Sequence, residues 1–208
     1  MKNNNDRNKL SVDTYNEIAK TYEEKFGEDF TDTIYIDKFL EFLEGKNILD
    51  IGCGVGNLTD YIYTKGFLIK GIDLSDEMLK IAKSKYKQIK FYKMDMRSPS
   101  FDEKFDGLML AYSLFHLSKA EVEKVLPKYY NLLNKNGKML IILQGGNGEK
   151  IINEPLNENL KIFFNYYTID EITKLLKTNN FNIIYTDIRK PKNIMELQND
   201  KIIIICER

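Results

Sequence analysis

The spacing of apolar residues divides the chain into an N-terminal part with helical periodicity and a longer part in which short apolar runs alternate with helical patterns. Apolar side chains recur every three or four residues over residues 12–26 and again over about residues 31–43, after which Gly45 follows. This spacing predicts two amphipathic helices, the second of which ends before the glycine. Residues 1–10 are polar and have little to bury, so we expect a disordered tail there.

From residue 46 onward, strands and helices are predicted to alternate. The predicted strands are residues 46–51, 67–73, 89–94, 105–111 and 138–143. The predicted helices between them are residues 58–64, 77–86 and 119–133. Strands separated by helices of this length form a parallel sheet that is covered on both faces. The pattern therefore predicts an α/β, doubly wound domain.

The last third of the chain departs from this alternation. Residues 144–165 are polar, rich in Gly and Asn, and show no clear period, which is typical of a functional or mobile connection. A helix is predicted at residues 168–177, and strands at 181–188 and 201–206. The segment between these two strands contains Pro191 and no helical pattern, so we expect the final pair to be antiparallel.

Composition narrows the classes of partner and compartment. The chain carries 31 Lys+Arg against 31 Asp+Glu, and this balance disfavours nucleic acid, which needs a surplus of positive charge. The two cysteines, Cys53 and Cys206, are too few for a disulfide framework, and no Cys/His cluster has metal-ligand spacing. No apolar stretch has the length of a signal peptide or a membrane span. We therefore expect a cytoplasmic protein with no metal and no membrane contact.

The strongest local signal is the glycine-rich turn after the first predicted strand. Residues 50–56 are Asp-Ile-Gly-Cys-Gly-Val-Gly, and such glycines permit positive φ and a close approach of the backbone to a ligand. The next strand ends at Asp73, where a carboxylate can accept hydrogen bonds from the ribose hydroxyls of an adenine-containing cofactor. The alternative is structural: the turn serves only the fold, and Asp73 and Asp95 cap the helices that follow them.

Asp50 distinguishes between two cofactors that fit such a turn, NAD and S-adenosylmethionine. It lies immediately before the glycines. A carboxylate there suits the ammonium and sulfonium charges of S-adenosylmethionine, whereas it would repel the pyrophosphate of a dinucleotide. The sequence therefore favours S-adenosylmethionine.

With these motifs the chain resembles the class I S-adenosylmethionine-dependent methyltransferases from about Tyr15 to its C-terminus. Segments similar to the five motifs of that family are residues 50–56, 71–78, 93–96, 105–117 and 132–141. The last of them departs from the usual Leu-Lys-Pro-Gly-Gly pattern at Asn134, Asn136 and Lys138. The resemblance implies a Rossmann-like, seven-stranded, mostly parallel sheet with an antiparallel last strand. It also implies one domain over residues 11–208, with residues 11–45 as a helical cap and residues 144–167 as an insert on the substrate side.

The resemblance implies roles for the motif residues around the cofactor and its product, S-adenosylhomocysteine. The loop 52–56 would lie under the methionine moiety, Asp73 would bind the ribose, and Asp95 would accept from the adenine amino group. The residues expected to contact the cofactor are Tyr22, Asp50, Gly52, Cys53, Gly54, Gly56, Asp73, Leu74, Met78, Asp95, Met96 and Ala111. Among these we expect Cys53 to be a small turn residue and not a nucleophile.

The residues after the fourth strand limit the classes of methyl acceptor. The Asn/Asp-Pro-Pro-Tyr segment of amino-methylating DNA enzymes and the Pro-Cys of cytosine C5 enzymes are both missing from the sequence. Ala111 and Tyr112 stand where metal-dependent, catechol-type enzymes carry an acidic ligand. This leaves a metal-free enzyme, a monomer or homodimer, that methylates an O or N atom of a small molecule. The alternatives are an RNA or protein methyltransferase and a non-catalytic cofactor-binding protein.

His116 is the single histidine and follows the fourth strand, where it can act as a general base near neutral pH. Its segment resembles that of phosphoethanolamine methyltransferases, in which such a histidine works with a tyrosine of the N-terminal helix. The resemblance makes Tyr15 and Tyr22 the candidate catalytic partners. An orienting or structural role for His116, and packing roles for the two tyrosines, remain the alternatives.

Overall fold

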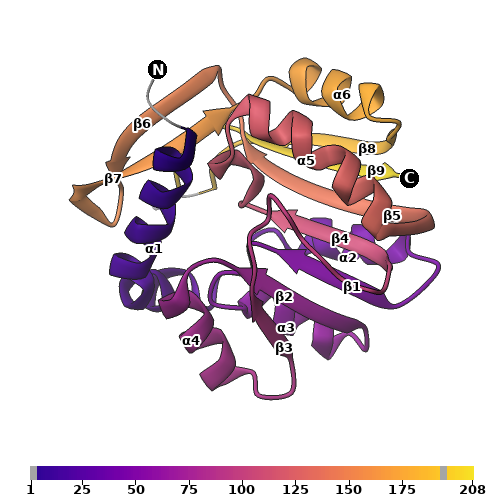
Figure 1. Ribbon diagram of the computed structural model, residues 1–208, viewed down its shortest axis with the longest axis horizontal. Helices are drawn as coiled ribbons and strands as arrows, with labels where there is room; N and C mark the ends of the chain where they lie inside the picture. The colour runs from indigo at the N-terminus through magenta and orange to yellow at the C-terminus, as the bar shows by residue number, and fades with distance from the viewer. Residues whose placement is uncertain (1–3, 193–195) are drawn as a thin grey trace.

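The central feature of the computed structural model, which describes residues 4–192 and 196–208, is a seven-stranded sheet with the order β3-β2-β1-β4-β5-β9-β8 (Figure 1). Its strands are β1 (Asn47–Ile51), β2 (Leu68–Asp73), β3 (Lys90–Lys93), β4 (Phe105–Ala111), β5 (Leu133–Gln144), β8 (Asn182–Arg189) and β9 (Lys201–Glu207). Strands β1 to β5 are parallel to one another, and β9 runs antiparallel to both β5 and β8. The predicted doubly wound sheet with an antiparallel last strand is confirmed.

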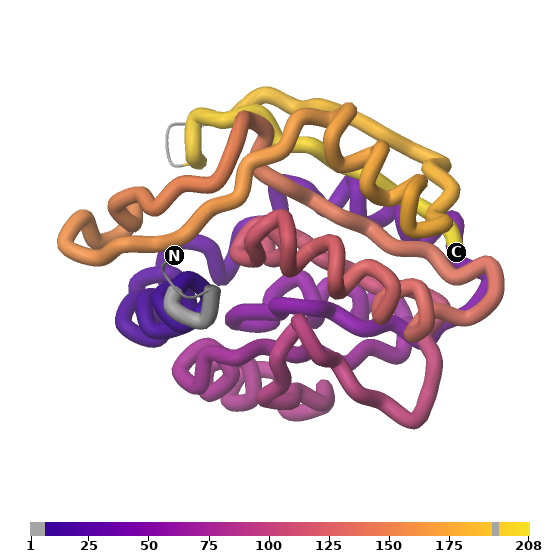
Figure 2. Tube along the Cα trace, turned by 45° about the horizontal axis from the view of Figure 1, so that its top comes forward, coloured from indigo at the N-terminus to yellow at the C-terminus, as the bar shows by residue number. Residues whose placement is uncertain are grey.

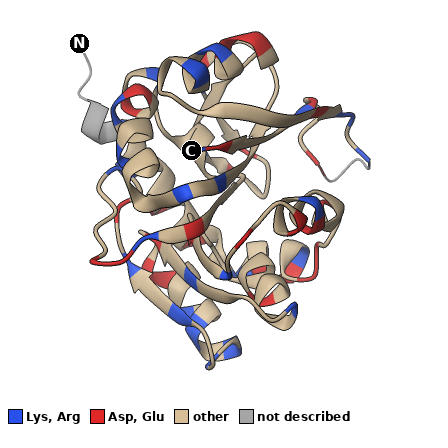
Figure 3. Ribbon diagram, turned by 90° about the vertical axis from the view of Figure 1, so that its right-hand side faces the viewer, with Lys and Arg blue, Asp and Glu red and all other residues tan. Residues whose placement is uncertain are grey.

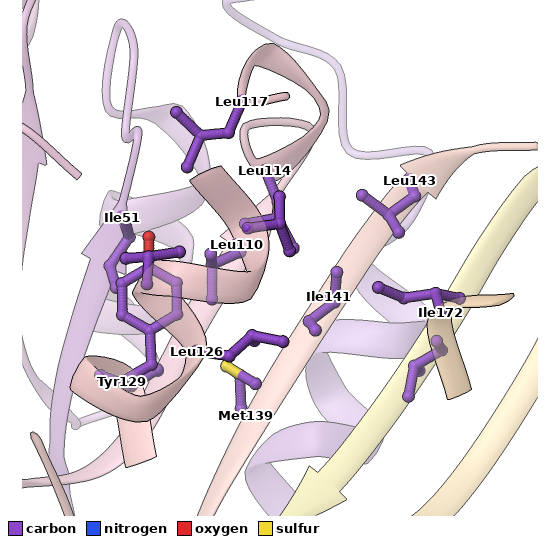
Figure 4. Close-up of a cluster of buried hydrophobic side chains, with 14 of the residues drawn as sticks. Ile51, Leu110, Leu114, Leu117, Leu126, Tyr129, Met139, Ile141, Leu143 and Ile172 are labelled. Carbon is purple, nitrogen blue, oxygen red and sulfur yellow. The ribbon is translucent and has the colours of Figure 1, made fainter. Parts of the chain in front are cut away.

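Helices cover both faces of this sheet. They are α1 (Asn4–Phe26), α2 (Thr33–Glu41), α3 (Asn57–Thr64), α4 (Asp76–Lys85), α5 (Lys119–Leu132) and α6 (Ile169–Thr178). Buried side chains of α2 and α3 pack in one core cluster, whereas those of α5 and α6 pack in another. Figure 4 shows the second cluster, in which Leu126 of α5 lies near Met139 of β5 and Tyr129 of α5 lies on the side of Ile51 of β1. Because both faces of the sheet are buried, the sequences of its strands are nearly continuous apolar runs.

Local signals in the sequence account for where several helices begin. Ser118 and Thr168 each form a capping box with a glutamate three residues later, at the starts of α5 and α6. Ser75 caps α4 by accepting a hydrogen bond from the Met78 backbone N–H at 3.2 Å. Such caps satisfy backbone donors that a helix start would otherwise leave unpaired. They fix where α4 begins after β2 and where α5 begins after β4.

The segment predicted to be an irregular connection, residues 144–165, is instead largely a β-hairpin. It consists of β6 (Gly148–Glu154) and β7 (Asn157–Tyr166), which pair antiparallel in a separate two-stranded sheet. Figure 2 shows the hairpin extending from the main sheet and passing beside α1. Period-two alternation is lost because β6 is mostly exposed, whereas the last five residues of β7 are all buried. The prediction of an irregular connection was therefore wrong, because these burial patterns hide the alternation by which a strand is recognised.

The N-terminal helix begins at Asn4, so the disorder expected for residues 1–10 does not hold for residues 4–10. Residues 1–3 lie outside the described residues. Arg7 forms an ion pair with Glu149 of β6, and its guanidinium lies 5.1 Å from the ring centroid of Phe163. Asn8 is also buried. Arg7 is thus held by contacts with the hairpin, which lies far away in the sequence.

Charges of both signs are interspersed over the molecule. In Figure 3, Lys and Arg lie near Asp and Glu on the same helices and strands. Among the residues that the structure describes, none of the helices combines the length and the apolar character that crossing a membrane requires.

Candidate active site

A cavity of about 430 Å³ lies at the carboxyl ends of the parallel strands, beneath α1 and the β6–β7 hairpin. This edge of a doubly wound sheet is where ligands bind, because the loops that leave the strand ends open a crevice between β1 and β4. We call Asp50, Gly52, Cys53, Gly54 and Asp73 the β1–β2 end of the cavity. The β5–β9 end is formed by Tyr112, Gln144, Arg189 and Lys201.

The glycine-rich turn needs its glycines for two different reasons. Gly52 has φ 78°, and a Cβ there would lie 2.3 Å from Ser113 Cβ. Gly54 has φ 53° and lines the cavity, and a Cβ there would meet no protein atom within 4 Å. Gly52 is therefore required by packing, whereas the Cβ that Gly54 lacks would occupy open space.

Gly56, which was also expected to contact the cofactor, does not line the cavity. It has φ 84° and caps α3. A Cβ there would lie 2.9 Å from the ring of Phe91. Its role is to let the turn and α3 pack closely on β3.

Asp50 is buried at the tip of β1. Its Oδ2 accepts a hydrogen bond of 2.6 Å from Thr59 Oγ1 of α3. Burial raises the pKa of Asp50 to about 7, an effect that Asp73 reinforces and the Thr59 hydrogen bond opposes. No Lys or Arg in the described part of the chain forms an ion pair with it. This carboxyl group would gain from a cationic ligand.

Asp73 lies at the tip of β2 and faces the same cavity. Its two carboxylate oxygens accept backbone hydrogen bonds of 2.9 Å from Gly54 and from Ser75. Burial raises the pKa of Asp73, although these hydrogen bonds oppose the shift. Each oxygen keeps a further lone pair, so the group can also accept from two ligand hydroxyls.

The carboxylate of Asp95 is paired with Arg97. Arg97 Nε and Nη2 donate to its carboxylate at 2.9 Å and 2.6 Å, and Asp95 is not among the residues that line the cavity. Although burial raises it, the hydrogen bonds and charge of Arg97 lower the pKa of Asp95 below its usual value. In this structure the carboxylate of Asp95 therefore faces Arg97, and its contact with the adenine stays a prediction. Met96, next to it, does line the cavity.

His116 and Tyr15 form a hydrogen-bonded pair inside the cavity. Tyr15 Oη lies 2.9 Å from His116 Nε2, and His116 Nδ1 lies 3.0 Å from the carbonyl oxygen of Phe163. Because a carbonyl can only accept, Nδ1 carries the proton and Tyr15 donates to Nε2. Burial lowers the pKa of His116 to about 4 and raises the pKa of Tyr15 well above its ordinary value. Both side chains are thus neutral near pH 7.

Tyr22, the other candidate partner of His116, lies seven residues after Tyr15 in α1. Its ring meets the ring of Tyr15 edge to face, with centroids 5.9 Å apart. Burial raises the pKa of Tyr22 to about 12. Tyr22 also lines the cavity, so the structure brings both tyrosines to the site and gives only Tyr15 the hydrogen bond to His116.

Tyr112, directly after β4, has φ 62°, which is a strained backbone conformation for a bulky side chain. Its hydroxyl donates to Asp32 and accepts from Arg189 Nη2 at 3.0 Å. Arg189 also donates to Asp32 at 2.5 Å and to Glu196 at 2.7 Å. This paired network holds Tyr112 against the β5–β9 end of the cavity.

Several lining residues had no individual prediction. They include Ser11, Asp32, Gln144, Glu154, Arg189 and Lys201. For Gln144 a usable signal exists, because a polar residue directly follows the buried apolar run of β5 at the strand's carboxyl end. Asp32 and Arg189 are 157 residues apart, and no local pattern connects them.

The comparisons with known proteins agree with this geometry. Residues 48–137 match a family model described as a methyltransferase domain. An uncharacterized methyltransferase of Geobacillus sp. (strain WCH70) is 26% identical over 188 residues, which cover 84% of this chain and 88% of that protein. The crystal structure of an S-adenosylmethionine-dependent methyltransferase from Methanosarcina mazei superposes with a TM-score of 0.73 at 20% identity, covering 82% of this chain and 96% of that one. The chain is an S-adenosylmethionine-dependent methyltransferase.

The cofactor of this methyltransferase is S-adenosylmethionine. A structural neighbour from Burkholderia thailandensis, 1,6-didemethyltoxoflavin-N1-methyltransferase, was solved with S-adenosylhomocysteine and 1,6-didemethyltoxoflavin bound. It superposes with a TM-score of 0.68 at 16% identity, covering 95% of this chain and 88% of that one.

The β1–β2 end of the methyltransferase cavity fits this cofactor. Gly54 leaves open space, Asp50 is a buried carboxyl group without a cation, and Asp73 retains lone pairs for ribose hydroxyls. All the positions expected to contact the cofactor line the cavity except Gly56 and Asp95. Within residues 4–192 and 196–208, no three His, Cys, Asp or Glu side chains come together in a way that could hold a metal ion.

Proposed function

We propose that this methyltransferase transfers a methyl group to an O or N atom of a small molecule, with Tyr15 and His116 removing the acceptor's proton and without a metal. The observation that carries the proposal is the hydrogen bond of 2.9 Å between Tyr15 Oη and His116 Nε2 inside the cavity. The cavity volume of about 430 Å³ lies in the range of small-molecule sites. The B. thailandensis neighbour shows that this fold can enclose a small acceptor together with S-adenosylhomocysteine.

The chain's own residues are proposed to position the cofactor at the β1–β2 end. Asp50 would face the ammonium group, and Asp73 would accept from the ribose hydroxyls. Leu74, Met78 and Met96 would flank the adenine. All five residues line the cavity. We further propose that residues 11–208 form one domain, in which α1 and the β6–β7 hairpin enclose the site.

S-adenosylmethionine supplies an electrophilic methyl group, so the acceptor's lone pair forms the new bond while the sulfur takes the electron pair of the broken C–S bond. Tyr15 and His116 handle the acceptor's proton. The phenol oxygen of Tyr15 takes it while the phenol's own proton passes to His116 Nε2. The Phe163 carbonyl, which accepts from Nδ1, keeps Nε2 free to receive that proton. Tyr15 and His116 are both neutral before the reaction, so no charges are separated in the cavity until the acceptor reacts.

The proposal is tested first by following tritiated methyl groups from S-adenosylmethionine into the small-molecule, RNA and protein fractions of a cell extract. Label in the small-molecule fraction is expected. Label in RNA or protein would favour the alternative acceptors, and no label in any fraction would favour a non-catalytic cofactor-binding protein.

With the labelled acceptor in hand, His116→Gln and Tyr15→Phe should each lower kcat by about a hundredfold, within the range typical of general-base removal. The affinity for S-adenosylhomocysteine, measured by calorimetry, should stay the same. Tyr63→Phe on the exposed face of α3 serves as the control. Unchanged turnover of the two cavity variants on the true acceptor would rule out the base.

A further inference from the structure

The β5–β9 end of the cavity holds a buried side chain with no partner. Gln144 is the last residue of β5 and is 5% exposed. Its Oε1 accepts no hydrogen bond from any residue that the structure describes, although the side chain lines the cavity. A buried amide without a partner costs stability. Such an atom beside an open cavity therefore points to a ligand group that completes it.

The strand register places Gln144 at the centre of this end. It pairs with Lys201 of β9, and on its other side the Tyr112 backbone N–H donates to the carbonyl of Ile142 in the same strand. The β1–β2 end, proposed for the cofactor, lies on the opposite side of β4 in the sheet order. Gln144 is thus placed on the side of the cavity that remains for the methyl acceptor.

The charged groups around Gln144 are already paired with one another. Arg189 is held by Asp32 and Glu196. Lys201 Nζ donates to the carbonyl oxygens of Leu197 and Asn199, both at 2.6 Å, and lies 3.6 Å from Glu196. A charged ligand would have to displace one of these partners in a buried setting. A neutral ligand can bind Gln144 without doing so.

The apolar wall of the cavity favours a flat ligand. The rings of Phe115 and Phe164 stack with centroids 4.8 Å apart and planes 13° apart, and both rings are buried and line the cavity. Stacked rings present a planar surface against which another ring packs well. A primary amide such as that of Gln144 pairs with an edge that carries an N–H donor beside an acceptor.

We propose that Gln144 is the specificity-determining residue for the acceptor, and that the acceptor is a neutral, planar nitrogen heterocycle with a lactam or similar donor–acceptor edge. The proposal rests on the proposed function, because the ligand it describes is the methyl acceptor. Gln144 binds that edge and thereby orients the ring against Phe115 and Phe164.

The test measures fragment binding to the full chain loaded with S-adenosylhomocysteine. Pyridone, a lactam, is compared with benzoate and benzylamine, which have similar size and opposite charges. Pyridone is expected to bind in preference to both. Gln144→Leu should weaken pyridone binding by at least about tenfold, since it leaves the ligand's polar edge unpaired. The affinity for S-adenosylhomocysteine should stay the same and serves as the check on folding.

Two further variants sharpen the result. Gln88→Leu removes an exposed amide outside the cavity and should leave pyridone binding unchanged. Gln144→Glu keeps the shape of the side chain but can only accept when ionised, so it should lose pyridone and gain benzamidine. The proposal is overturned if pyridone fails to bind the wild-type chain, if benzoate or benzylamine binds as well, or if both Gln144 variants that retain S-adenosylhomocysteine binding also retain pyridone. None of these measurements requires methyl transfer, so the Tyr15–His116 proposal can fail or stand independently.

Discussion

We expect the buried carboxyl group of Asp50 to couple stability to cofactor binding. Its pKa is raised to about 7 by burial, so between about pH 4 and 7 the folded chain holds a proton there that the unfolded chain has lost. Stability from this group is therefore present at acid pH and is lost as the pH rises through about 7. A ligand ammonium group would reverse that loss by pairing with the carboxylate.

Asp50→Asn is expected to separate these two effects. From pH 5 to pH 8 the free energy of unfolding of the variant should rise relative to that of wild type by about 3 kcal/mol. The folded-state pKa of about 7 lies about two units above pH 5, and a tenfold change in proton affinity is worth about 1.4 kcal/mol. Urea unfolding at the two pH values measures this. Calorimetry should show weaker binding of S-adenosylhomocysteine, and equal affinity would contradict the ammonium contact.

Gly54→Ala tests whether the open space at the turn belongs to the cofactor. The φ of 53° makes alanine strained by about 1 kcal/mol, yet its Cβ would meet no protein atom within 4 Å. Affinity for S-adenosylhomocysteine should fall at least about tenfold, because the methyl group takes space needed by the ligand. The matched control is Gly66→Ala, which has φ 86° and equally open surroundings but does not line the cavity. Equal loss of binding in both variants would attribute the effect to strain.

At the same scale, Asp73 and Asp95 show what a motif can predict. Both follow predicted strands, and both were expected at the cofactor. Asp73 faces the cavity, and its partners Gly54 and Ser75 offer only backbone N–H groups. Asp95 has Arg97 two residues later, and a local ion pair turns its carboxylate away. The motif determines the position of the backbone, whereas competition among nearby side chains determines what each group faces.

Among the elements, α1 is tied to the β6–β7 hairpin and to the start of α4 by polar contacts, in addition to the apolar packing of its buried residues. Thr14 Oγ1 donates to the Lys161 carbonyl at 2.6 Å, and Asn16 Oδ1 accepts from Ser75 Oγ at 2.7 Å. Such contacts stabilise an element less than a continuous apolar core does. Both elements also contribute residues to the cavity lining.

We therefore expect S-adenosylhomocysteine to slow amide hydrogen exchange in α1 and the hairpin. Helix α6, which packs in the core cluster and does not line the cavity, should exchange at the same rate with and without ligand. Exchange measured by mass spectrometry on the full chain tests both parts. Protection spread evenly over all helices, or missing from α1, would exclude a role for α1 in closing the site.

The elements also show where periodicity fails as a guide. The sheet strands and the helices between them were predictable because each is long, apolar on the expected faces and bounded by turn residues. The hairpin was not, since neither β6 nor β7 shows alternation and its contact with α1 is long-range. For the same reason, the first turns of α1 could not be predicted from polar residues that become ordered only against the hairpin.

At the scale of the whole molecule, two buried groups impose opposite pH dependences on stability. Burial lowers the pKa of His116 to about 4, against about 6.5 in an unfolded chain. Stability from the neutral imidazole is therefore fully present above about pH 6.5 and is lost as the pH falls toward 4, by up to about 3 kcal/mol. Asp50 acts in the other direction over much of this range.

In His116→Gln, the decrease in stability with rising pH that Asp50 causes should no longer be offset by His116. Relative to wild type, the variant should gain stability as the pH falls from about 7 to 4.5, because its unfolded chain has no imidazole to protonate. Urea unfolding across this range tests the difference, which cancels contributions from the other carboxylates. A constant difference between the two proteins would show that the imidazole titrates alike when folded and unfolded.

The placement of His116 has a practical consequence for spectroscopy. It is the single histidine of the chain, so one imidazole signal in an NMR spectrum of untagged protein needs no assignment. The ring touches Tyr15 of α1, Phe115 of η1 (Leu114–His116) and Phe164 of β7. Ring currents from three separate elements thus converge on one nucleus. Displacement of any of these elements, whether by ligand, pH or substitution, can be followed as a change in a single chemical shift.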